Sequence, residues 1–213
     1  MTFDEQRAKM VDTQLKARGL GDERLLAAFG KVPRHVFVPE EFRDEAYADH
    51  PLPIGAGQTI SQPYIVALMV DCLGLRGHER VLEIGSGSGY QTALLAELAL
   101  EVFSIERVPE LLRAVQVRLS TLGYLNVHLA AGNGSLGWPE HAPFDAIIVS
   151  AAAPRMPLPL VTQLVEGGRM AIPIGAPQSQ MLVQADKRRG VLHQQDVASC
   201  VFVPLIGDYG WPV

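Results

Sequence analysis

The chain has 213 residues, of which 48% are hydrophobic and 19% are charged, and its formal net charge is −5. This length and composition suit a single globular domain, residues 1–213, which we expect to be a monomer. The acidic balance argues against a general nucleic-acid binder, which would carry a basic face. The two cysteines, Cys72 and Cys200, are too few for a disulfide framework, so a cytoplasmic, reducing location is expected.

The start of the chain, Met1 to Gln6, is polar and does not resemble a signal peptide. No apolar segment reaches the roughly 20 residues that a spanning helix needs, so we expect no membrane association. Residues 1–63 show no alternation of strands and helices, and we interpret them as a small helical cap with a substrate-side loop. The expected elements are a helix at 4–18, a helix at 23–29, an extended segment at 32–39, a short helix at 40–47 and a polar loop at 51–63.

A helix from Tyr64 to about Leu75 then begins the core, residues 64–213. Pro63 suits the first helical position, where no amide hydrogen is needed. Ser61 or Gln62 suits the N-cap, and a capping serine is the structural interpretation of Ser61 that spacing alone favours.

The most informative stretch follows, because a buried strand at 81–84 leads through a glycine turn at 85–89 into a helix at 90–98. This is the opening unit of a nucleotide-binding α/β sheet. The dinucleotide fingerprint would need a small residue where Tyr90 stands, which makes a nicotinamide oxidoreductase a distant alternative. The G-x-G-x-G spacing with Glu83 two residues before it resembles the first motif of class I S-adenosylmethionine-dependent methyltransferases. A glycine turn without a ligand is the competing interpretation.

A second acid supports a cofactor site. Glu106 ends a strand at 102–105, and an acid in this position can accept hydrogen bonds from both hydroxyls of a ribose. The same device serves NAD, so Glu106 indicates a ribose without identifying the nucleotide. A solvated acid ahead of the next helix is the alternative.

The alternation continues to the end of the chain and predicts a mostly parallel, Rossmann-like sheet with helices on both faces. The expected elements are a helix at 108–122, strands at 127–130 and 144–149, a helix at 157–165, a strand at 169–173 and an antiparallel edge hairpin made of 180–186 and 197–205. The segments 85–89, 106, 132–134 and 150–153 all follow strands. Because ligands of such sheets bind at the carboxyl ends of the strands, these segments predict one cleft.

Motifs of several other chemistries are absent from the sequence. There is no G-x-S-x-G elbow, no H-E-x-x-H and no glycine–lysine phosphate loop. The six histidines show no paired ligand spacing, and we expect no metal.

Over nearly its whole length the sequence resembles the protein-L-isoaspartate O-methyltransferase family, which repairs damaged proteins. The substrate-side segment 57–63, Gly-Gln-Thr-Ile-Ser-Gln-Pro, distinguishes this family from other class I methyltransferases. The remaining matching segments are Met10-Val11 to Leu15, Val32-Pro33-Arg34, Phe37-Val38-Pro39, Val81 to Gly89, Ser104-Ile105-Glu106, Pro143 to Ala153, Leu164 to Gly175 and Phe202-Val203-Pro204-Leu205.

The resemblance implies roles for individual residues. Ser61 is implied as the active-site residue that holds the substrate by hydrogen bonds, with Thr59, Ile60 and Leu205 beside it. The implied S-adenosylmethionine contacts are Gln62, Pro63, Tyr64, Ile65, Glu83, Gly85, Ser86, Gly87, Glu106, Asn133 and Gly134.

Three positions depart from the family pattern. Asn133 replaces an aspartate near the adenine amino group; its carbonyl can still accept a hydrogen bond, but the lost charge predicts weaker cofactor binding. Tyr64 stands where many members have histidine, so no role passes to its ring. Ile206 stands where some members have a hydroxyl, which puts a polar contact there in doubt.

The implied reaction is methyl transfer from S-adenosylmethionine to the free α-carboxylate of isoaspartyl residues in proteins, leaving S-adenosylhomocysteine and starting repair through a succinimide. Two alternatives remain open. One is another class I methyltransferase acting on a small molecule or RNA, and the other is a non-catalytic binding module that has kept the fold.

Overall fold

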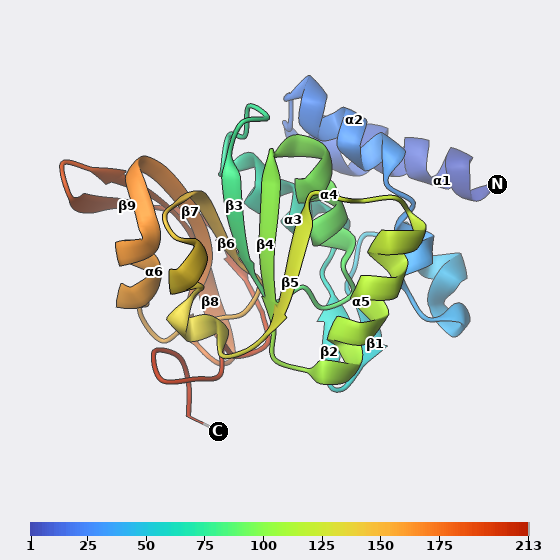
Figure 1. Ribbon diagram of the computed structural model, residues 1–213. Coiled ribbons are helices and arrows are strands. Elements are labelled where there is room, and N and C mark those ends of the chain that lie inside the picture. The colour runs from blue at the N-terminus through green and yellow to red at the C-terminus, as the bar shows by residue number, and fades with distance from the viewer. Residues whose placement is uncertain (213) are drawn as a thin grey trace.

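A seven-stranded sheet in the order β5-β4-β3-β6-β7-β8-β9 forms the centre of the computed structural model, which describes residues 1–212 (Figure 1). The strands are β3 Arg80–Ile84, β4 Glu101–Glu106, β5 Val127–Ala131, β6 Phe144–Val149, β7 Leu164–Ala176, β8 Ser179–Arg188 and β9 Val191–Cys200. The helices are α1 Phe3–Met10, α2 Glu23–Lys31, α3 Pro63–Asp71, α4 Tyr90–Leu98, α5 Pro109–Thr121 and α6 Leu158–Gln163. No helix within residues 1–212 has the length and apolar character needed to cross a membrane.

The strands from β5 to β7 pair in parallel, and β8 and β9 add an antiparallel edge. The predicted fold class is therefore confirmed, but the last strand was misplaced. It covers residues 191–200 because the hairpin turns at Arg189 and Gly190, both with positive φ, directly after Arg188 pairs with Val191. Two residues with positive φ match the twist of a tight hairpin. The polar character of the segment alone did not show where this turn lies.

Alternate residues of the central strands enter two separate cores. Val81 and Val102 face the larger core with α3, α4 and α5, whereas Leu82 and Phe103 face the smaller core with α6. Side chains that point to opposite faces with a period of two explain why these strands are apolar throughout. Helices accordingly cover both faces of the sheet.

Two helical segments of the N-terminal cap depart from the expectation. The predicted helix at 4–18 is one helical run, but α1 passes into a π-helical turn at Val11–Leu15 and a 3₁₀ turn at Lys16–Arg18. The segment predicted to be extended contains a 3₁₀ helix at Arg34–Phe37, and another at Glu40–Glu45 forms the expected short helix.

The segment predicted as a polar loop is in fact a β-hairpin. Its strands are β1 Leu52–Gly55 and β2 Gln58–Ile60, with Ala56 and Gly57 at positive φ in the turn. Figure 1 shows this hairpin at the end of the sheet where β4 and β5 finish and the C-terminal segment returns. The hairpin therefore stands beside the predicted cleft.

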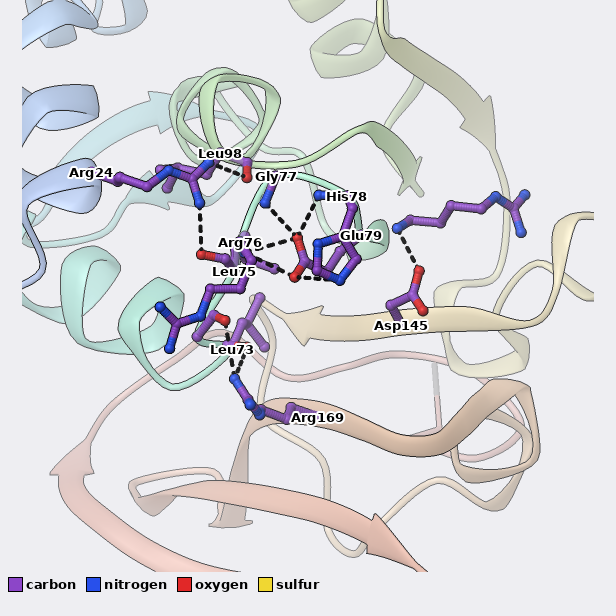
Figure 2. Close-up of polar contacts among 12 residues, drawn as sticks. Arg24, Leu73, Leu75, Arg76, Gly77, His78, Glu79, Leu98, Asp145 and Arg169 are labelled. Atoms are coloured by element: carbon purple, nitrogen blue, oxygen red, sulfur yellow. Dashed lines mark hydrogen bonds and ion pairs between the residues drawn. The ribbon is translucent and has the colours of Figure 1, made fainter.

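The connection from α3 to β3 lies at the end of the sheet opposite the hairpin β1–β2. Hydrogen bonds from side chains to main-chain groups fix this connection (Figure 2). The Glu79 carboxylate accepts hydrogen bonds from the backbone N–H groups of Arg76, Gly77 and His78. Two arginines add further hydrogen bonds. Arg24 donates to the carbonyls of Leu75 and Leu98, and Arg169 donates to those of Leu73 and Gly74. These contacts lie far from the glycine turn and serve the scaffold.

Candidate functional site

A cavity of about 230 Å³ opens at the carboxyl ends of β3, β4 and β6. Three parts of the chain meet there: the glycine turn after β3, the hairpin β1–β2 with the residue after it, and the C-terminal segment. The cavity is lined by residues 57–61, Val66, 84–88, Tyr90, Gln91, 105–108, Gly134, Ser150, Ala151 and 203–206. The strand ends that were predicted to form one cleft therefore do converge.

The glycine turn brings bare backbone to this cavity. Gly85, Gly87 and Gly89 have φ values of +89°, +53° and +88°, which other residues adopt only with strain. A Cβ at Gly89 would lie 3.1 Å from Val115, and one at Gly87 would touch Ile54 of the hairpin at 3.5 Å. The turn therefore needs glycine for its conformation at all three positions, and at Gly89 also for close packing.

Glu106 is held at the cavity by main-chain groups from two segments. Its Oε2 accepts a hydrogen bond from the Gly87 N–H at 2.9 Å, and its Oε1 accepts one from the Val108 N–H at 2.8 Å. Each carboxylate oxygen can accept a further bond. A pair of neighbouring hydroxyls, as on a ribose, suits these free positions.

Glu83 stands behind the cavity wall, completely buried. Its carboxylate accepts hydrogen bonds from the side chains of Gln91, Thr92 and Ser104 at 2.9, 2.6 and 2.6 Å. Burial raises the pKa of Glu83 to about 7, against the opposing effect of these three bonds. Gln91 lines the cavity and also donates to the Ser150 hydroxyl at 2.7 Å. Glu83 therefore orients the side chain of Gln91 and does not itself line the cavity.

The substrate-side residues Thr59, Ile60 and Ser61 form one lip of the cavity. Ser61 does not cap the following helix: the N-cap of α3 is Gln62, and no side chain bonds to the helix end there. The capping interpretation of Ser61 is therefore wrong. A hairpin ending directly before a proline-started helix leaves Ser61 on the wall instead.

The C-terminal segment supplies the other lip. Ala152 donates to the Val203 carbonyl and accepts from the Leu205 N–H, both at 2.8 Å, so the segment runs beside the residues that follow β6. Leu205 lines the cavity, and Ile206 lines it with an apolar side chain.

Besides Glu83, five expected cofactor contacts lie outside this lining. Gln62, Pro63, Tyr64 and Ile65 do not line the cavity, and the Tyr64 ring instead packs 3.8 Å from the Arg18 guanidinium carbon. The fifth, Asn133, lines a second cavity of about 550 Å³ that shares Arg107 and Ile206 with the first.

Asn133 is engaged by its own loop and by the C-terminal segment. Its Oδ1 accepts hydrogen bonds from the Ser135 N–H at 3.1 Å and the Ser135 hydroxyl at 2.8 Å, and its Nδ2 donates to the Asp208 carboxylate at 2.7 Å. The carbonyl that was expected to accept a bond from a ligand is therefore used within the loop. Asp208 brings a carboxylate back to this point.

Sequence reasoning missed two kinds of residue. Gln91 lines the cavity and links Glu83 to Ser150 of the predicted cleft, a role that no sequence spacing reveals. Arg34 lies beneath the Ser61 lip, although the sequence marked it only as part of the family-matching segment Val32-Pro33-Arg34 and gave it no role.

The lining suits a neutral nucleoside joined to an amino acid. Ser86 and Tyr90 line the cavity, and their hydroxyl oxygens are buried without a hydrogen-bond partner in the protein. Within residues 1–212, no group of three or more His, Cys, Asp or Glu side chains could hold a metal ion.

Comparison with known proteins adds a consistent result. Residues 5–210 match the family model for protein-L-isoaspartate(D-aspartate) O-methyltransferase. A protein-L-isoaspartate O-methyltransferase of Syntrophus aciditrophicus is 54% identical over 212 residues, covering 98% of this chain and 97% of the relative. Another, from Methanoculleus marisnigri, is 52% identical over 206 residues, covering 97% and 94%.

Two solved structures agree with this result. One named protein-L-isoaspartate O-methyltransferase is 30% identical with a TM-score of 0.87, over 96% of this chain and 67% of that one. A crystal structure from Plasmodium falciparum, assigned to the same activity and solved in complex with S-adenosyl-L-homocysteine, is 26% identical with a TM-score of 0.81, over 94% and 98%.

Proposed function

The chain belongs to the protein-L-isoaspartate(D-aspartate) O-methyltransferase family, and from this premise we propose how its residues divide the work of the reaction. It is an S-adenosylmethionine-dependent enzyme that methylates the α-carboxylate of isoaspartyl residues in proteins, the step that opens their repair through a succinimide. The other classes of function left open by the sequence are not favoured.

The glycine turn and the two strand ends beside it form the cofactor wall of our proposal. S-adenosylmethionine supplies a methyl group on a positively charged sulfur, which is already a good leaving group. Gly85, Ser86, Gly87 and Gly134 offer bare or small surface to its amino-acid part and ribose, and Glu106 accepts the ribose hydroxyls. The second cavity, which Asn133 lines, adjoins the first and suits the adenine base of the cofactor.

Thr59, Ile60, Ser61 and Leu205 hold the substrate in this proposal. These four residues line the same cavity as the cofactor wall, which is the observation that carries the assignment. The Ser61 hydroxyl donates a hydrogen bond to the isoaspartyl carboxylate and so aligns one oxygen with the methyl group.

The chemistry requires little beyond this alignment. An α-carboxyl group has a pKa of about 3.5, so it is ionised and nucleophilic at neutral pH without a general base. Residues of this chain need only fix the geometry and exclude water, and orientation of this kind can supply much of the rate enhancement. A base beside Ser61 is therefore not part of the mechanism.

Gln62, Pro63, Tyr64 and Ile65 remain part of the proposed cofactor environment through the position of α3 rather than through the cavity lining. We also propose that the enzyme is a cytoplasmic monomer that acts on isoaspartyl proteins and not on nucleic acid, which the net charge of −5 supports.

The test is a paired assay with an isoaspartyl peptide and its normal aspartyl twin. Radiolabelled S-adenosylmethionine should transfer its methyl group to the isoaspartyl peptide alone. Equal labelling of both peptides, or labelling of neither, would contradict the proposed function.

A further inference from the structure

Arg34 is completely buried directly beneath the substrate lip. Its Nε donates a hydrogen bond to the Ala46 carbonyl at 2.7 Å, and its Nη2 donates to the Ser61 carbonyl at 2.8 Å. Its Nη1 is buried without a hydrogen-bond partner. The guanidinium carbon lies 5.0 Å from the centre of the Tyr90 ring. Arg34 thus contacts two residues of the cavity wall from behind.

The charge of Arg34 is unbalanced. The arginine ion pairs found within residues 1–212 involve Arg7, Arg18, Arg80, Arg113, Arg169 and Arg188, and Arg34 forms none. Burial lowers its pKa to about 10, which leaves it protonated at neutral pH. A buried charge without a partner costs several kcal/mol, so this one points to an anion that comes from outside the chain.

The substrate brings such an anion to the other side of the same wall. Ser61 and Tyr90 both line the cavity, and the group to be methylated is a carboxylate. We propose that Arg34 is a positioning residue, which holds the Ser61 main chain and anchors the isoaspartyl carboxylate electrostatically through that wall. This inference rests on the proposed function. The exposed Arg107, on the side that the two cavities share, is the competing anchor.

The reaction itself predicts how this anchor affects the kinetics. As the carboxylate oxygen bonds to the methyl carbon, the carbon–sulfur bond breaks and its electron pair passes to sulfur, leaving a neutral ester and a neutral thioether. The carboxylate therefore loses charge on the way to the transition state. A fixed cation stabilises the bound substrate at least as much as the transition state, so its loss should raise KM without lowering kcat.

Arg34→Met, Arg34→Lys and a control variant test the proposal. Arg34→Met should raise KM for an isoaspartyl peptide about tenfold or more, the order expected for a unit charge acting over several ångströms at an effective dielectric constant of about 20. The kcat and the dissociation constant of S-adenosylhomocysteine should stay within about threefold. Arg34→Lys keeps the charge and should recover most of the KM.

Arg24→Met, at an exposed arginine, is the control. Arg24 also donates to two main-chain carbonyls, those of Leu75 and Leu98, but at the other end of the sheet (Figure 2). This variant should lose stability without changing the peptide KM. A result in which both methionine variants raise KM equally would identify a general structural effect and overturn the proposal.

Three further results would overturn it: an unchanged KM in Arg34→Met, a joint change of KM, kcat and cofactor affinity, or a lysine variant as poor as the methionine variant. If Arg34→Met does not fold, the salt dependence of the wild-type enzyme decides. A buried charge is screened little, so KM should change less than about threefold between about 50 and 500 mM salt. A steep rise would assign the anchor to exposed Arg107.

Different results would reject the proposed function and the role of Arg34. A wild-type enzyme that does not methylate the isoaspartyl peptide rejects the proposed function, and the role of Arg34 with it. A wild-type enzyme that methylates the peptide, with an Arg34→Met variant of normal KM, rejects the role of Arg34 alone.

Discussion

Oε2 of Glu106 lies 2.9 Å from the backbone nitrogen of Gly87 and accepts its hydrogen bond. The acid that ends β4 is thereby fixed to the middle of the glycine turn that follows β3. Because Val108 N–H binds the other oxygen, the carboxylate cannot rotate away from the cavity. Two segments that sequence analysis treated as separate cofactor signals therefore form one unit.

Glu106→Gln should weaken cofactor binding strongly. The amide group would direct a donor at either the Gly87 or the Val108 N–H, and it would lose an acceptor for the ribose. Hydrogen bonds to charged groups contribute roughly 1.5–3 kcal/mol, so the dissociation constant of S-adenosylhomocysteine should rise about tenfold or more. Titration calorimetry measures this. Glu110→Gln, on the exposed side of α5, should bind normally; wild-type affinity in both variants would remove Glu106 from the cofactor site.

Ser61→Ala should lower turnover while cofactor affinity persists. The serine lies on the substrate lip and its loss removes a hydrogen bond that aligns the carboxylate, so we expect kcat to fall on the order of tenfold or more. The measurements are steady-state kinetics with an isoaspartyl peptide and calorimetry with S-adenosylhomocysteine. Ser199→Ala, exposed on β9, is the control. Parallel losses of turnover and of cofactor binding would argue against a substrate role for Ser61.

The raised pKa of Glu83 predicts how the free energy of unfolding depends on pH. Its folded-state pKa of about 7 lies above the ordinary value of 4.5 for a glutamate, so between these values the folded protein holds more protons than the unfolded chain. The free energy of unfolding should therefore fall as the pH rises through this window. Relative to Glu83→Gln, the wild-type protein should lose more than about 1 kcal/mol between pH 5 and 7.5, since one pKa unit is worth about that much.

Urea denaturation of both proteins at the two pH values checks this expectation. The comparison isolates Glu83 because the other titrating groups are common to both proteins. A glutamine variant whose stability falls with pH as steeply as that of the wild-type protein would place the titration elsewhere.

The strands and helices around the glycine turn could be predicted because their local sequence patterns agree with the alternation of strands and helices along the chain. Tyr90–Leu98 is the helix that the sequence predicts, residue for residue, and Phe144–Val149 is the predicted strand. The hairpin β1–β2 could not be predicted, since its strands are short and its turn uses Ala56 at positive φ. Its Ile54 lies against the glycine turn, a tertiary contact that local sequence does not reveal.

The candidate site could be predicted as far as the residues that follow strands. Glu106 and the turn glycines were found because strand ends of a parallel sheet share one edge. Arg34 and Gln91 were not, because each acts through the hydrogen bond that it makes to another residue: Arg34 through Ser61, and Gln91 through Glu83. Spacing carries no information about such pairs.

Asn133 and Asp208 provide the last prediction, because the position that departs from the family pattern is coupled to the C-terminal segment. Asn133→Asp restores the family residue, but it places a carboxylate where the amide now donates to Asp208 at 2.7 Å. Repulsion should release the C-terminal segment from the second cavity, so the single variant should bind S-adenosylhomocysteine less tightly than the wild-type protein rather than more. The double variant Asn133→Asp/Asp208→Asn reverses the donor and the acceptor and should recover the affinity.

A double-mutant cycle on the dissociation constant, completed by Asp208→Asn, measures this coupling. Asp208 is exposed, so we expect a coupling energy of only about 0.5–1 kcal/mol, favouring the wild-type and double variants over the single ones. The Ser135 N–H and hydroxyl bond to Oδ1 of residue 133 and an aspartate can accept both, so the loop itself should stay intact in every variant. If Asn133→Asp alone tightens binding, the charge at residue 133 acts directly on the cofactor, and Asp208 does not take its place.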